Sequence, residues 1–497
     1  MATAGGGPVA DEHVRYGTAR GRWVIVAAVL GSGIAFLDMT VVNVALPKIG
    51  DDLGGGLSGL QWTLDGYLLT LSSLLLLGGA LGDEYGRKRM FVIGLVSFTV
   101  ASVLCGVAPS IGTLIAARAL QGAGGALLVP GSLAIITSSF ESDDHGAAVG
   151  AWAGLSGLST ALGPFLGGWL VDAVSWRLVF LINVPLAAVA LWVTLRHVPE
   201  SRDPEAGERP DFAGALTATL GLGGVVFALI QGPAHGWSAA AVAAGLIGVA
   251  ALVAFPFVER RVESPLVPLE IFKSRQFSGA NGTTFVVYAG LNAALFLVVV
   301  ELQTALGYSA LAAGAATLPI TVLLLLLSPY AGRLSQRIGP RIPMTVGPLI
   351  VAVGLFLLAG IDPETTYFIG IFPGLVVFGL GLAITVAPLT AAVMAAVDER
   401  HVGVGSGVNN AVARIAGLLS VAVLPALAGL ETASTGSAFT EGAGRALYIS
   451  AALAVLGALI SWLTIRNAAA VRTPPPPDVT YACQDPCIRE RQVGKAA

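Results

Sequence analysis

The apolar and polar positions of this chain are arranged in long blocks. Apolar stretches with few charges recur from residue 23 to residue 465, and short polar segments separate them. A helix needs about 20 mostly apolar residues to cross a bilayer. By that measure the pattern predicts an all-α polytopic membrane protein with fourteen spans, at residues 23–46, 60–81, 90–108, 111–138, 147–171, 177–196, 212–232, 238–258, 277–300, 310–330, 342–361, 366–393, 403–429 and 445–465. The two least certain of these predicted spans are 90–108, which is short, and 366–393, which contains Pro388.

The distribution of Lys and Arg tests this count. If the N-terminus is cytoplasmic, 22 of the 27 Lys and Arg residues fall in cytoplasmic segments, and only Lys48, Arg177 and Arg445 fall on the other side. Cytoplasmic loops of membrane proteins carry such an excess, and a miscounted span would mix the two groups. The sequence therefore predicts a multi-pass protein of the inner (plasma) membrane with both termini cytoplasmic. Loop 140–146 is an exception without explanation, since it carries acids but no Lys or Arg.

Composition agrees with a membrane protein and narrows its partners. Hydrophobic residues make up 55% of the chain and charged residues 11%, against about 25% charged in soluble domains. The lipid bilayer is thus an expected partner, and nothing in the net charge of −3 suggests nucleic acid. Residues 1–22 are polar and lack the apolar core of a cleavable signal peptide.

Several absences argue against an enzyme. The five histidines lie in predicted loops or at span ends, and the chain has no G-x-x-x-x-G-K-[ST] nucleotide-binding loop. Cys483 and Cys487 are too few for a structural zinc site, which takes four ligands. We expect no metal and no other cofactor, so that energy comes from a proton gradient or the process is passive.

A charged loop near residue 80 has a copy later in the chain. Residues 79–89 read GALGDEYGRKR, and the spacing of Gly79, Leu81, Asp83 and Gly86 returns 253 residues later at 332–339. Two glycines suit a tight turn between helices because glycine adopts positive φ. If the loop after the second span corresponds to the loop after the tenth, two six-helix halves flank an inserted pair, as in secondary transporters with repeated halves. The predicted division is an N-terminal tail (1–22), a six-helix half (23–196), a linker with two inserted spans (197–276), a second half (277–465) and a disordered tail (466–497).

Charges inside the predicted spans are the candidates for chemistry. Asp38, Asp65 and Arg118 lie roughly 12, 7 and 10 Å from the outer ends of their spans at a rise of 1.5 Å per residue. A buried carboxyl group near an arginine can load and release a proton as its access to water changes. We therefore predict these three residues as proton-coupling residues. The alternative is a fixed ion pair that only holds helices together.

Other polar residues within spans are candidates for a substrate cavity. Arg414 lies roughly 16 Å into its span, where it either contacts substrate or caps the carbonyls of a helix break. Glu301 and Gln303 are expected to face an outer vestibule. The full set of predicted cavity residues is Asn43, Tyr67, Gln121, Asn292, Glu301, Gln303, Asn410 and Arg414.

These residues resemble the major facilitator superfamily, in its fourteen-span drug:proton antiporter branch, over nearly all of 23–465. Residues 37–47 (LDMTVVNVALP) match the first-helix signature, and 79–89 match the loop motif, with Glu84 where a basic residue is common. Residues 118–124 (RALQGAG) match the fourth-helix motif, whose arginine is implicated in proton transfer. Residues 163–168 (GPFLGG) match the fifth-helix motif associated with exporters.

The resemblance implies alternating access by rocking of two halves, driven by proton exchange, in a protein that we expect to function as a monomer. Asp83 is expected to hold the cytoplasmic side shut at the start of a helix in the other half, because a helix N-terminus favours an anion. The fifth helix is expected to be kinked or loosened and closely packed at the interface of the halves. The predicted gating residues are Gly79, Asp83, Gly86, Arg87, Gly163, Pro164, Gly167 and Gly168.

Three functions fit the sequence. The first is a proton-coupled exporter of small amphipathic drugs or antibiotics across the cytoplasmic membrane. The second is a dedicated exporter of a metabolite made by the same cell, which would give self-resistance. The third is a receptor or scaffold that does not transport, against which the costly charges of Asp38 and Arg118 argue.

Overall fold

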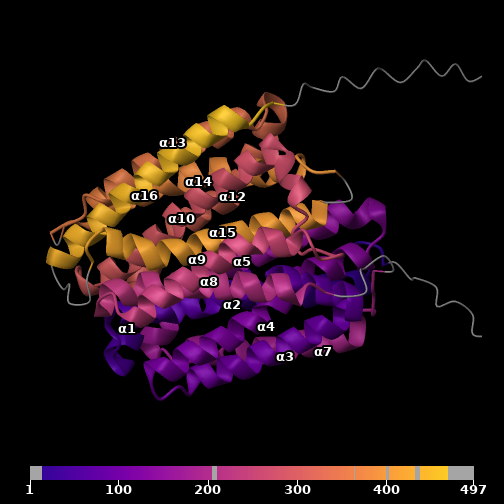
Figure 1. The fold of residues 1–497 in the computed structure, drawn as a ribbon, viewed down its shortest axis with the longest axis horizontal. Coiled ribbons are helices and arrows are strands. Elements are labelled where there is room, and N and C mark those ends of the chain that lie inside the picture. The colour runs from indigo at the N-terminus through magenta and orange to yellow at the C-terminus, as the bar shows by residue number, and fades with distance from the viewer. Residues whose placement is uncertain (1–13, 204–209, 363, 399–401, 431–436, 468–497) are drawn as a thin grey trace, which may run out of the picture.

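The computed structural model describes residues 14–203, 210–362, 364–398, 402–430 and 437–467. Over this part of the chain it is helical, with no sheet (Figure 1). The helices are α1 (Ala19–Leu53), α2 (Gly56–Tyr85), α3 (Arg87–Gly106), α4 (Ile111–Ser139), α5 (His145–Ala173), α6 (Leu178–Leu181), α7 (Asn183–His197), α8 (Phe212–His235), α9 (Ala239–Glu259), α10 (Arg275–Thr304), α11 (Ala310–Ala316), α12 (Leu318–Ile338), α13 (Arg341–Leu358), α14 (Phe372–Met394), α15 (Val402–Leu427) and α16 (Ser437–Thr464). Short turns of other helix types are η1 (Ser142–Asp144), η2 (Leu269–Lys273) and η3 (Tyr367–Ile371). Cys483 and Cys487 lie outside the described residues.

The predicted fold class is confirmed. Within the described residues, 13 helical segments are long and apolar enough to cross a membrane. The predicted span 147–171 lies within α5, a helix of 29 residues that is not among these 13 segments. Three predicted spans consist of two consecutive segments: α6 with α7, α11 with α12, and η3 with α14. The two weakest predictions, 90–108 and 366–393, are both helical.

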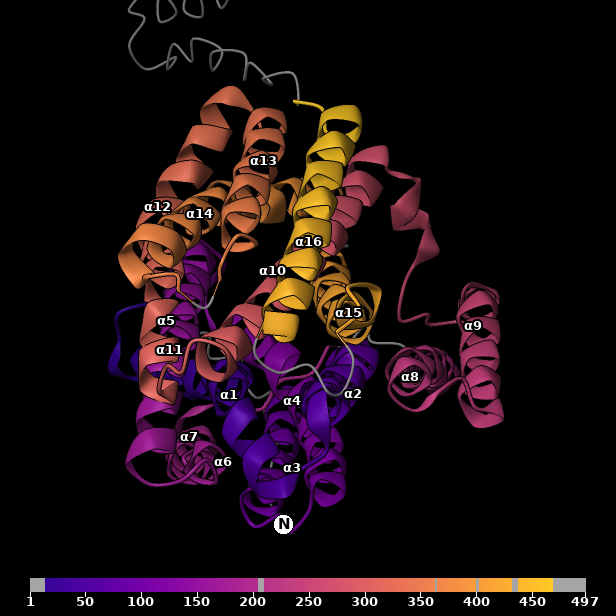
Figure 2. The ribbon, with the colours of Figure 1, turned by 90° about the vertical axis from the view of Figure 1, so that its left-hand side faces the viewer.

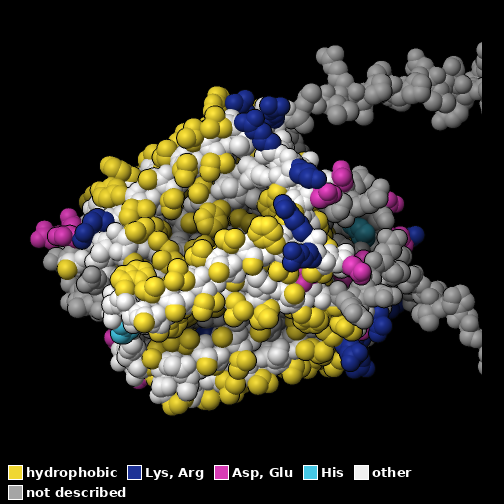
Figure 3. Space-filling view, viewed as in Figure 1, with side chains coloured by type: hydrophobic (Ala, Val, Ile, Leu, Met, Phe, Trp, Pro, Cys, Tyr) yellow, Lys and Arg dark blue, Asp and Glu magenta, His cyan; other side chains and the backbone are white. Residues whose placement is uncertain are grey.

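The helices form two groups with a pair at the side. Figure 2 shows most of the N-terminal group, α1–α7, in the lower half and most of the C-terminal group, α10–α16, in the upper half, with α5 and α11 side by side where they meet. Helices α8 and α9 form a hairpin beside them: α8 packs against α2 and α15, where the two groups meet, and α9 lies outermost. Apolar side chains cover much of the face in Figure 3, and Lys and Arg gather toward its right-hand end. We call this the basic end; α1, α3, α10 and α13 begin there, with Arg15, Arg87, Lys88, Arg275 and Arg341 at or just before their first turns.

The sequence repeat has a structural counterpart at the basic end. Gly86 ends α2 at φ 110°, and Gly339 ends α12 at φ 84°. Glu200 Oε1 accepts a hydrogen bond from Lys88 N at 3.1 Å, beside Gly86. Asn467 Oδ1 accepts one from Arg341 N at 3.2 Å, beside Gly339. The two groups therefore share one arrangement. A side chain just after the last helix, α7 or α16, caps the start of α3 or α13. In each case it lies against a glycine that has no room for a side chain.

We expect Gly86→Ala and Gly339→Ala each to lower stability by about 1–3 kcal/mol, because both positions have positive φ and a close side-chain oxygen. The measurement is thermal unfolding of the purified protein in detergent. Gly112→Ala is the matched control, since a Cβ on Gly112 meets nothing within 4 Å. An equal loss in all three variants would contradict this account of the repeat.

The acidic loop that breaks the Lys and Arg pattern binds the beginning of the described chain. Glu141 Oε1 accepts a hydrogen bond from Arg15 Nε at 3.1 Å, and Asp144 Oδ2 accepts one from Tyr16 N at 2.7 Å. Val14 N donates to Ser139 O at 2.7 Å. The acids of loop 140–146 thus serve as partners for the basic segment before α1.

Candidate functional site

Asp38 of α1 is the centre of a buried polar network. Its side chain and that of Arg118 are 0% and 1% exposed. Arg118 Nη1 donates to Asp38 Oδ2 at 2.5 Å, while Gln121 Nε2 and Asn183 Nδ2 donate to Oδ1 at 2.8 and 3.0 Å. A buried charge is tolerated only when it is paired and hydrogen-bonded in this way. The structure therefore brings the predicted Asp38 and Arg118 together and joins α1, α4 and α7.

Arg118 has further contacts besides its ion pair with Asp38. Its Nε donates to Thr63 O of α2 at 3.0 Å, and its Nη1 also donates to Gln121 Oε1 at 2.6 Å. The guanidinium lies over the ring of Tyr67, with Cζ 4.3 Å from the ring centroid. Tyr67 and Gln121, predicted to line a substrate cavity, are both 0% exposed and contact these protein groups. They do not line an open cavity in this conformation.

Sequence analysis gave no role to two members of the network, Ser102 and Asn183. Gln121 Nε2 and Asn183 Nδ2 both donate to Ser102 Oγ, at 2.7 and 3.1 Å. Asn183 is an amide within a predicted span, and this signal could have marked it. Ser102 is one hydroxyl among many in apolar runs, and the sequence alone gives no signal for it.

Asp65 lies apart from this network. It is 0% exposed, and within the part of the chain that the structure describes, neither of its carboxylate oxygens has a hydrogen-bond partner. The indole Nε1 of Trp62, almost one turn earlier on α2, also lacks a partner there. The three predicted proton-coupling residues are therefore one ion pair and one separate buried acid.

Arg414 of α15 reaches from the C-terminal group to α1. Its Nη1 lies 3.3 Å from Met39 Sδ, and its Cζ lies 5.8 Å from the ring centroid of Phe36. The side chain is only 8% exposed, and its Nε has no partner among the described residues. The predicted cavity residue Arg414 thus contacts the helix turn that carries Asp38.

Glu301 and Gln303 do not face an open vestibule as expected. Glu301 is 2% exposed, and Gln303 Nε2 donates to Val44 O of α1 at 3.0 Å. The physical reason is that the two groups are in contact here, so that these side chains are enclosed between helices.

The three predicted asparagines do not form one cluster. Asn43 Oδ1 is buried without a donor among the described residues. Asn292 Nδ2 donates to Tyr288 O at 2.8 Å on its own helix. Asn410 is exposed, and its Nδ2 donates to Ser406 O at 3.3 Å. The hydrogen bonds therefore do not define a single substrate site.

The glycine motif packs α5 closely against two other helices. A Cβ on Gly163 would overlap the side chain of Thr40 in α1, and one on Gly167 would lie 3.0 Å from Val41 Cα. A Cβ on Gly168 would lie 2.5 Å from Leu311 Cα in α11. On the facing helix, a Cβ on Gly314 would overlap Pro164 O. Helix α5 nevertheless continues from His145 to Ala173 through Pro164.

Within the part of the chain that the structure describes, three hydrogen-bonded contacts join the two groups at the end opposite to the basic end. Gln303 binds Val44 O as described, and Gln61 Nε2 donates to Val421 O at 2.6 Å. Asp172, just past the predicted fifth span, accepts hydrogen bonds from Ala310 N and Leu311 N at 3.2 and 2.8 Å. These two N–H groups begin α11, where a helix favours a negative charge. Sequence analysis assigned no role to Asp172.

Among the residues that the structure describes, the predicted inter-half contact of Asp83 is not formed. Asp83 Oδ1 accepts a hydrogen bond from Arg87 Nε at 2.8 Å, and its backbone O accepts one from Asp203 N at 3.1 Å. Gly79, in the same motif, packs toward Pro130 of α4. The loop motif therefore binds within the N-terminal group and to the segment after it, while the groups are joined at the opposite end.

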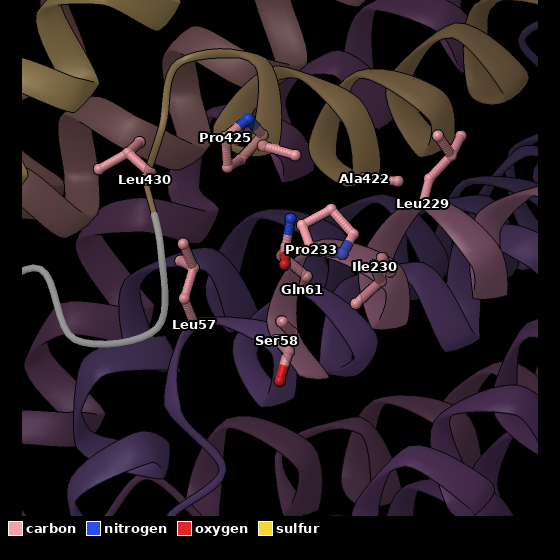
Figure 4. A pocket seen from close by; sticks show the side chains of 11 residues that line it. Leu57, Ser58, Gln61, Leu229, Ile230, Pro233, Ala422, Pro425 and Leu430 are labelled. Atoms are coloured by element: carbon pink, nitrogen blue, oxygen red, sulfur yellow. The ribbon is translucent and has the colours of Figure 1, made fainter. Parts of the chain in front are cut away.

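A small cavity lies beside Gln61 where α8 meets the two groups. Figure 4 shows it between α2, α8 and the end of α15, with Gln61 near its centre. Its volume is ≈ 20 Å³, which is room for about one water molecule. It is too small to hold a substrate of drug size.

Comparisons with known proteins agree with the fold. Residues 28–421 and 282–486 match the Major Facilitator Superfamily. The Multidrug resistance protein Stp of Mycobacterium tuberculosis is 35% identical over 402 residues, which cover 80% of this chain and 74% of that protein. The Methylenomycin A resistance protein of Bacillus subtilis is 36% identical over 445 residues, or 88% of this chain and 93% of that protein.

A solved structure shows the same fold at low identity. The crystal structure of a POT family transporter in complex with thioalcohol-conjugated peptide matches with a TM-score of 0.68 and 14% identity, covering 90% of this chain and 96% of that one.

Two groups of membrane-spanning helices, with a buried ion pair inside the first of them, are typical of a polytopic membrane transporter. The chain belongs to the Major Facilitator Superfamily, and it carries small molecules across the membrane by alternating access.

Proposed function

We propose that this protein exports small amphipathic drugs or antibiotics in exchange for protons. The observation that carries the coupling is the position of Asp38 on α1. Residues on the next two turns of the same helix touch three other elements: Met39 meets Arg414, Thr40 and Val41 meet α5, and Val44 meets Gln303.

This arrangement links a proton to the contact between the groups. When Asp38 takes up a proton, it loses its charge and its ion pair with Arg118 weakens. Helix α1 is then free to shift against α4 and α7. Because the same stretch of α1 contacts α5 and the C-terminal group, a shift there changes how the groups meet at the end opposite to the basic end. Asp65, buried and without a partner among the described residues, is the second candidate for the exchanged proton.

Orientation and assembly belong to the same proposal. The basic end is cytoplasmic because membrane proteins carry excess Lys and Arg there, and both termini lie on that side of the plasma membrane. The groups α1–α7 and α10–α16 are the two halves that rock, and α8–α9 is the inserted pair. The protein works as a monomer, with the proton gradient and no cofactor as its source of energy.

The names of the relatives support export and leave two kinds of substrate. One relative is named for multidrug resistance and another for resistance to methylenomycin A alone. A dedicated exporter of one endogenous metabolite is therefore the second candidate function.

The test is uptake of substrate by everted membrane vesicles, which turn export into accumulation. A panel of toxic dyes, antibiotics and metabolites of the producing cell is tested with and without a protonophore. We expect accumulation that the protonophore abolishes, for many dyes if the protein is a multidrug exporter and for one metabolite if it is dedicated. Accumulation that persists with the protonophore would contradict proton coupling, and no accumulation of any compound would contradict export.

We expect Asp172→Ala to loosen the outer contact between the groups. The variant loses a carboxylate at a helix N-terminus, a contribution of about 0.3–1 kcal/mol, or more when partly buried. The outward-open population should then rise, and a cysteine placed at Val44 should label faster from outside. Asp51→Ala is the control, since the Asp51 side chain is 75% exposed. Equal labelling in parent and Asp172→Ala would show that this contact does not hold the outer side closed.

A further inference from the structure

Two buried acids in the α8–α9 hairpin have no part in the network around Asp38. Asp211 precedes α8 and Glu259 ends α9, so both lie at the basic end. Each residue is only 2% exposed. Acids in such a position normally project into water, and their burial indicates a specific role.

The two carboxyl groups face each other. A Cβ on Gly214 would lie 2.5 Å from Glu259 Oε1 and would also overlap Asp211 Oδ2. These same two oxygens meet no N–H or O–H donor among the described residues. Both lie beside the same point on Gly214, so the two carboxyl groups are neighbours, and Asp211 acts on the Glu259 side chain. Ionised carboxylates are acceptors only, so a hydrogen bond between them requires one proton.

The other oxygens of the pair hold the backbone. Asp211 Oδ1 accepts a hydrogen bond from Gly214 N at 2.6 Å, which caps α8. Glu259 Oε2 accepts one from Val267 N at 2.9 Å, in the segment that leads to η2 and α10. The pair thus ties the start of α8, the end of α9 and the connection to the C-terminal group.

Among residues 14–203, 210–362, 364–398, 402–430 and 437–467, no Lys or Arg acts on Glu259 in place of the proton. The charge that acts on Glu259 is that of Asp211, and the other groups that act on it are the backbone N–H groups of Leu266 and Val267. Arg260, Arg261 and Glu263 follow α9 but are exposed. Within the described residues, no group of three or more His, Cys, Asp or Glu side chains could hold a metal ion.

We propose that Asp211 and Glu259 form a site for one shared proton, which fastens the α8–α9 hairpin to the segment before α10. This site is separate from the proposed transport proton at Asp38 and does not depend on it. Loss of the proton leaves two adjacent buried negative charges, which repel each other and release Val267. Since α8 packs where the two groups meet, the pair makes this contact sensitive to pH at the basic end.

The test is infrared spectroscopy of the full-length protein in lipid nanodiscs near neutral pH. Subtracting the spectrum of Glu259→Gln from that of the parent should leave the C=O stretching band of one carboxylic acid, and Asp211→Asn should remove the same band. In either variant the new amide donates to the remaining carboxylate, so the proton is no longer needed. Glu263→Gln, an exposed acid on the same segment, should remove only a carboxylate band.

A second measurement keeps the test independent of the band assignment. Thermal stability of the parent should fall as the pH is raised through the titration of the pair, and either single variant should lose that dependence. Loss of a carboxylate band in place of the acid band would overturn the proposal. A shift of the infrared band of Asp211 and Glu259 on adding Mg²⁺ or Na⁺, or on chelation, would also overturn it, because the pair would then hold a cation. Either variant alone decides the result if the other fails to fold.

Discussion

Asp38→Asn is expected to abolish efflux driven by the proton gradient. The amide keeps the shape of the side chain but cannot take up or release a proton. Substrate-induced proton release from the purified protein, measured across pH, should fall by the share that Asp38 carries. Binding of substrate should persist, because Asp38 is buried and contacts protein groups on both of its oxygens. Asp51→Asn, at an exposed acid later on the same helix, should behave like the parent.

The variant also changes stability, and this effect must be separated from the loss of coupling. Removing one partner of a buried ion pair costs about 3–5 kcal/mol because the other charge stays buried. The double variant Asp38→Asn/Arg118→Gln removes both charges and should recover much of that stability. If Asp38 carries the proton, the double variant is stable but still does not couple. A single variant that folds and still releases the full number of protons would move the coupling to Asp65.

The positions of the membrane-spanning helices are the part of the fold that the sequence predicts best. Lipid requires about 20 apolar residues per span, so the blocks of apolar residues mark nearly every helix directly. Helix α5 shows the limit of that signal. It is not among the 13 segments that are apolar enough to cross a membrane, yet its glycines let it approach α1 and α11. One side of α5 packs against these helices, while Leu162, Phe165 and Trp169 on the same helix are 51%, 47% and 50% exposed.

The sequence predicts how deep in the membrane the site residues lie, but it does not predict which residues they contact. The rise per residue places Asp38 and Arg118 at one level in the membrane, and they do meet. Whether Asp65 joins them depends on how α2 is rotated about its axis, which packing decides. Asp172 was missed because an acid at a span end is ordinary in a sequence. Its role comes from the first turn of α11, 138 residues away.

The loop motif shows a further limit, because one sequence serves several conformations. Its glycine geometry was predicted only in part: Gly86 adopts a positive φ, whereas Gly79 lies inside α2 and does not. The partner of the motif was not predicted, since Asp83 binds Arg87 in a structure whose groups are joined at the opposite end. In an alternating-access protein, a contact implied by a motif belongs to one state of the cycle, and the structure shows a single state.

The close contact of α5 with α1 leads to the other large effect. Gly163→Leu is expected to stop transport, because even a Cβ at this position overlaps the Thr40 side chain of α1. Overpacking of this kind costs about 1–3 kcal/mol, and here it separates the helix that carries Asp38 from α5. The measurement is efflux normalised to the folded protein in the membrane. Gly157→Leu is the matched control in the same helix, since a Cβ on Gly157 meets nothing within 4 Å.

A pair of smaller changes tests the same contact more sharply. Gly163→Ala adds only the Cβ, whose closest neighbours are Thr40 Oγ1 and Thr40 Cβ, with Leu37 O next at 3.4 Å. Gly163→Ala should therefore slow efflux, and Thr40→Ala added to it should restore part of the rate by removing the hydroxyl oxygen. Thr40→Ala alone should be mild, since its hydroxyl donates to the carbonyl oxygens of Phe36 and Leu37 on its own helix. If Gly163→Ala is slow and Thr40→Ala does not relieve it, the glycine is needed for a reason other than its contact with α1.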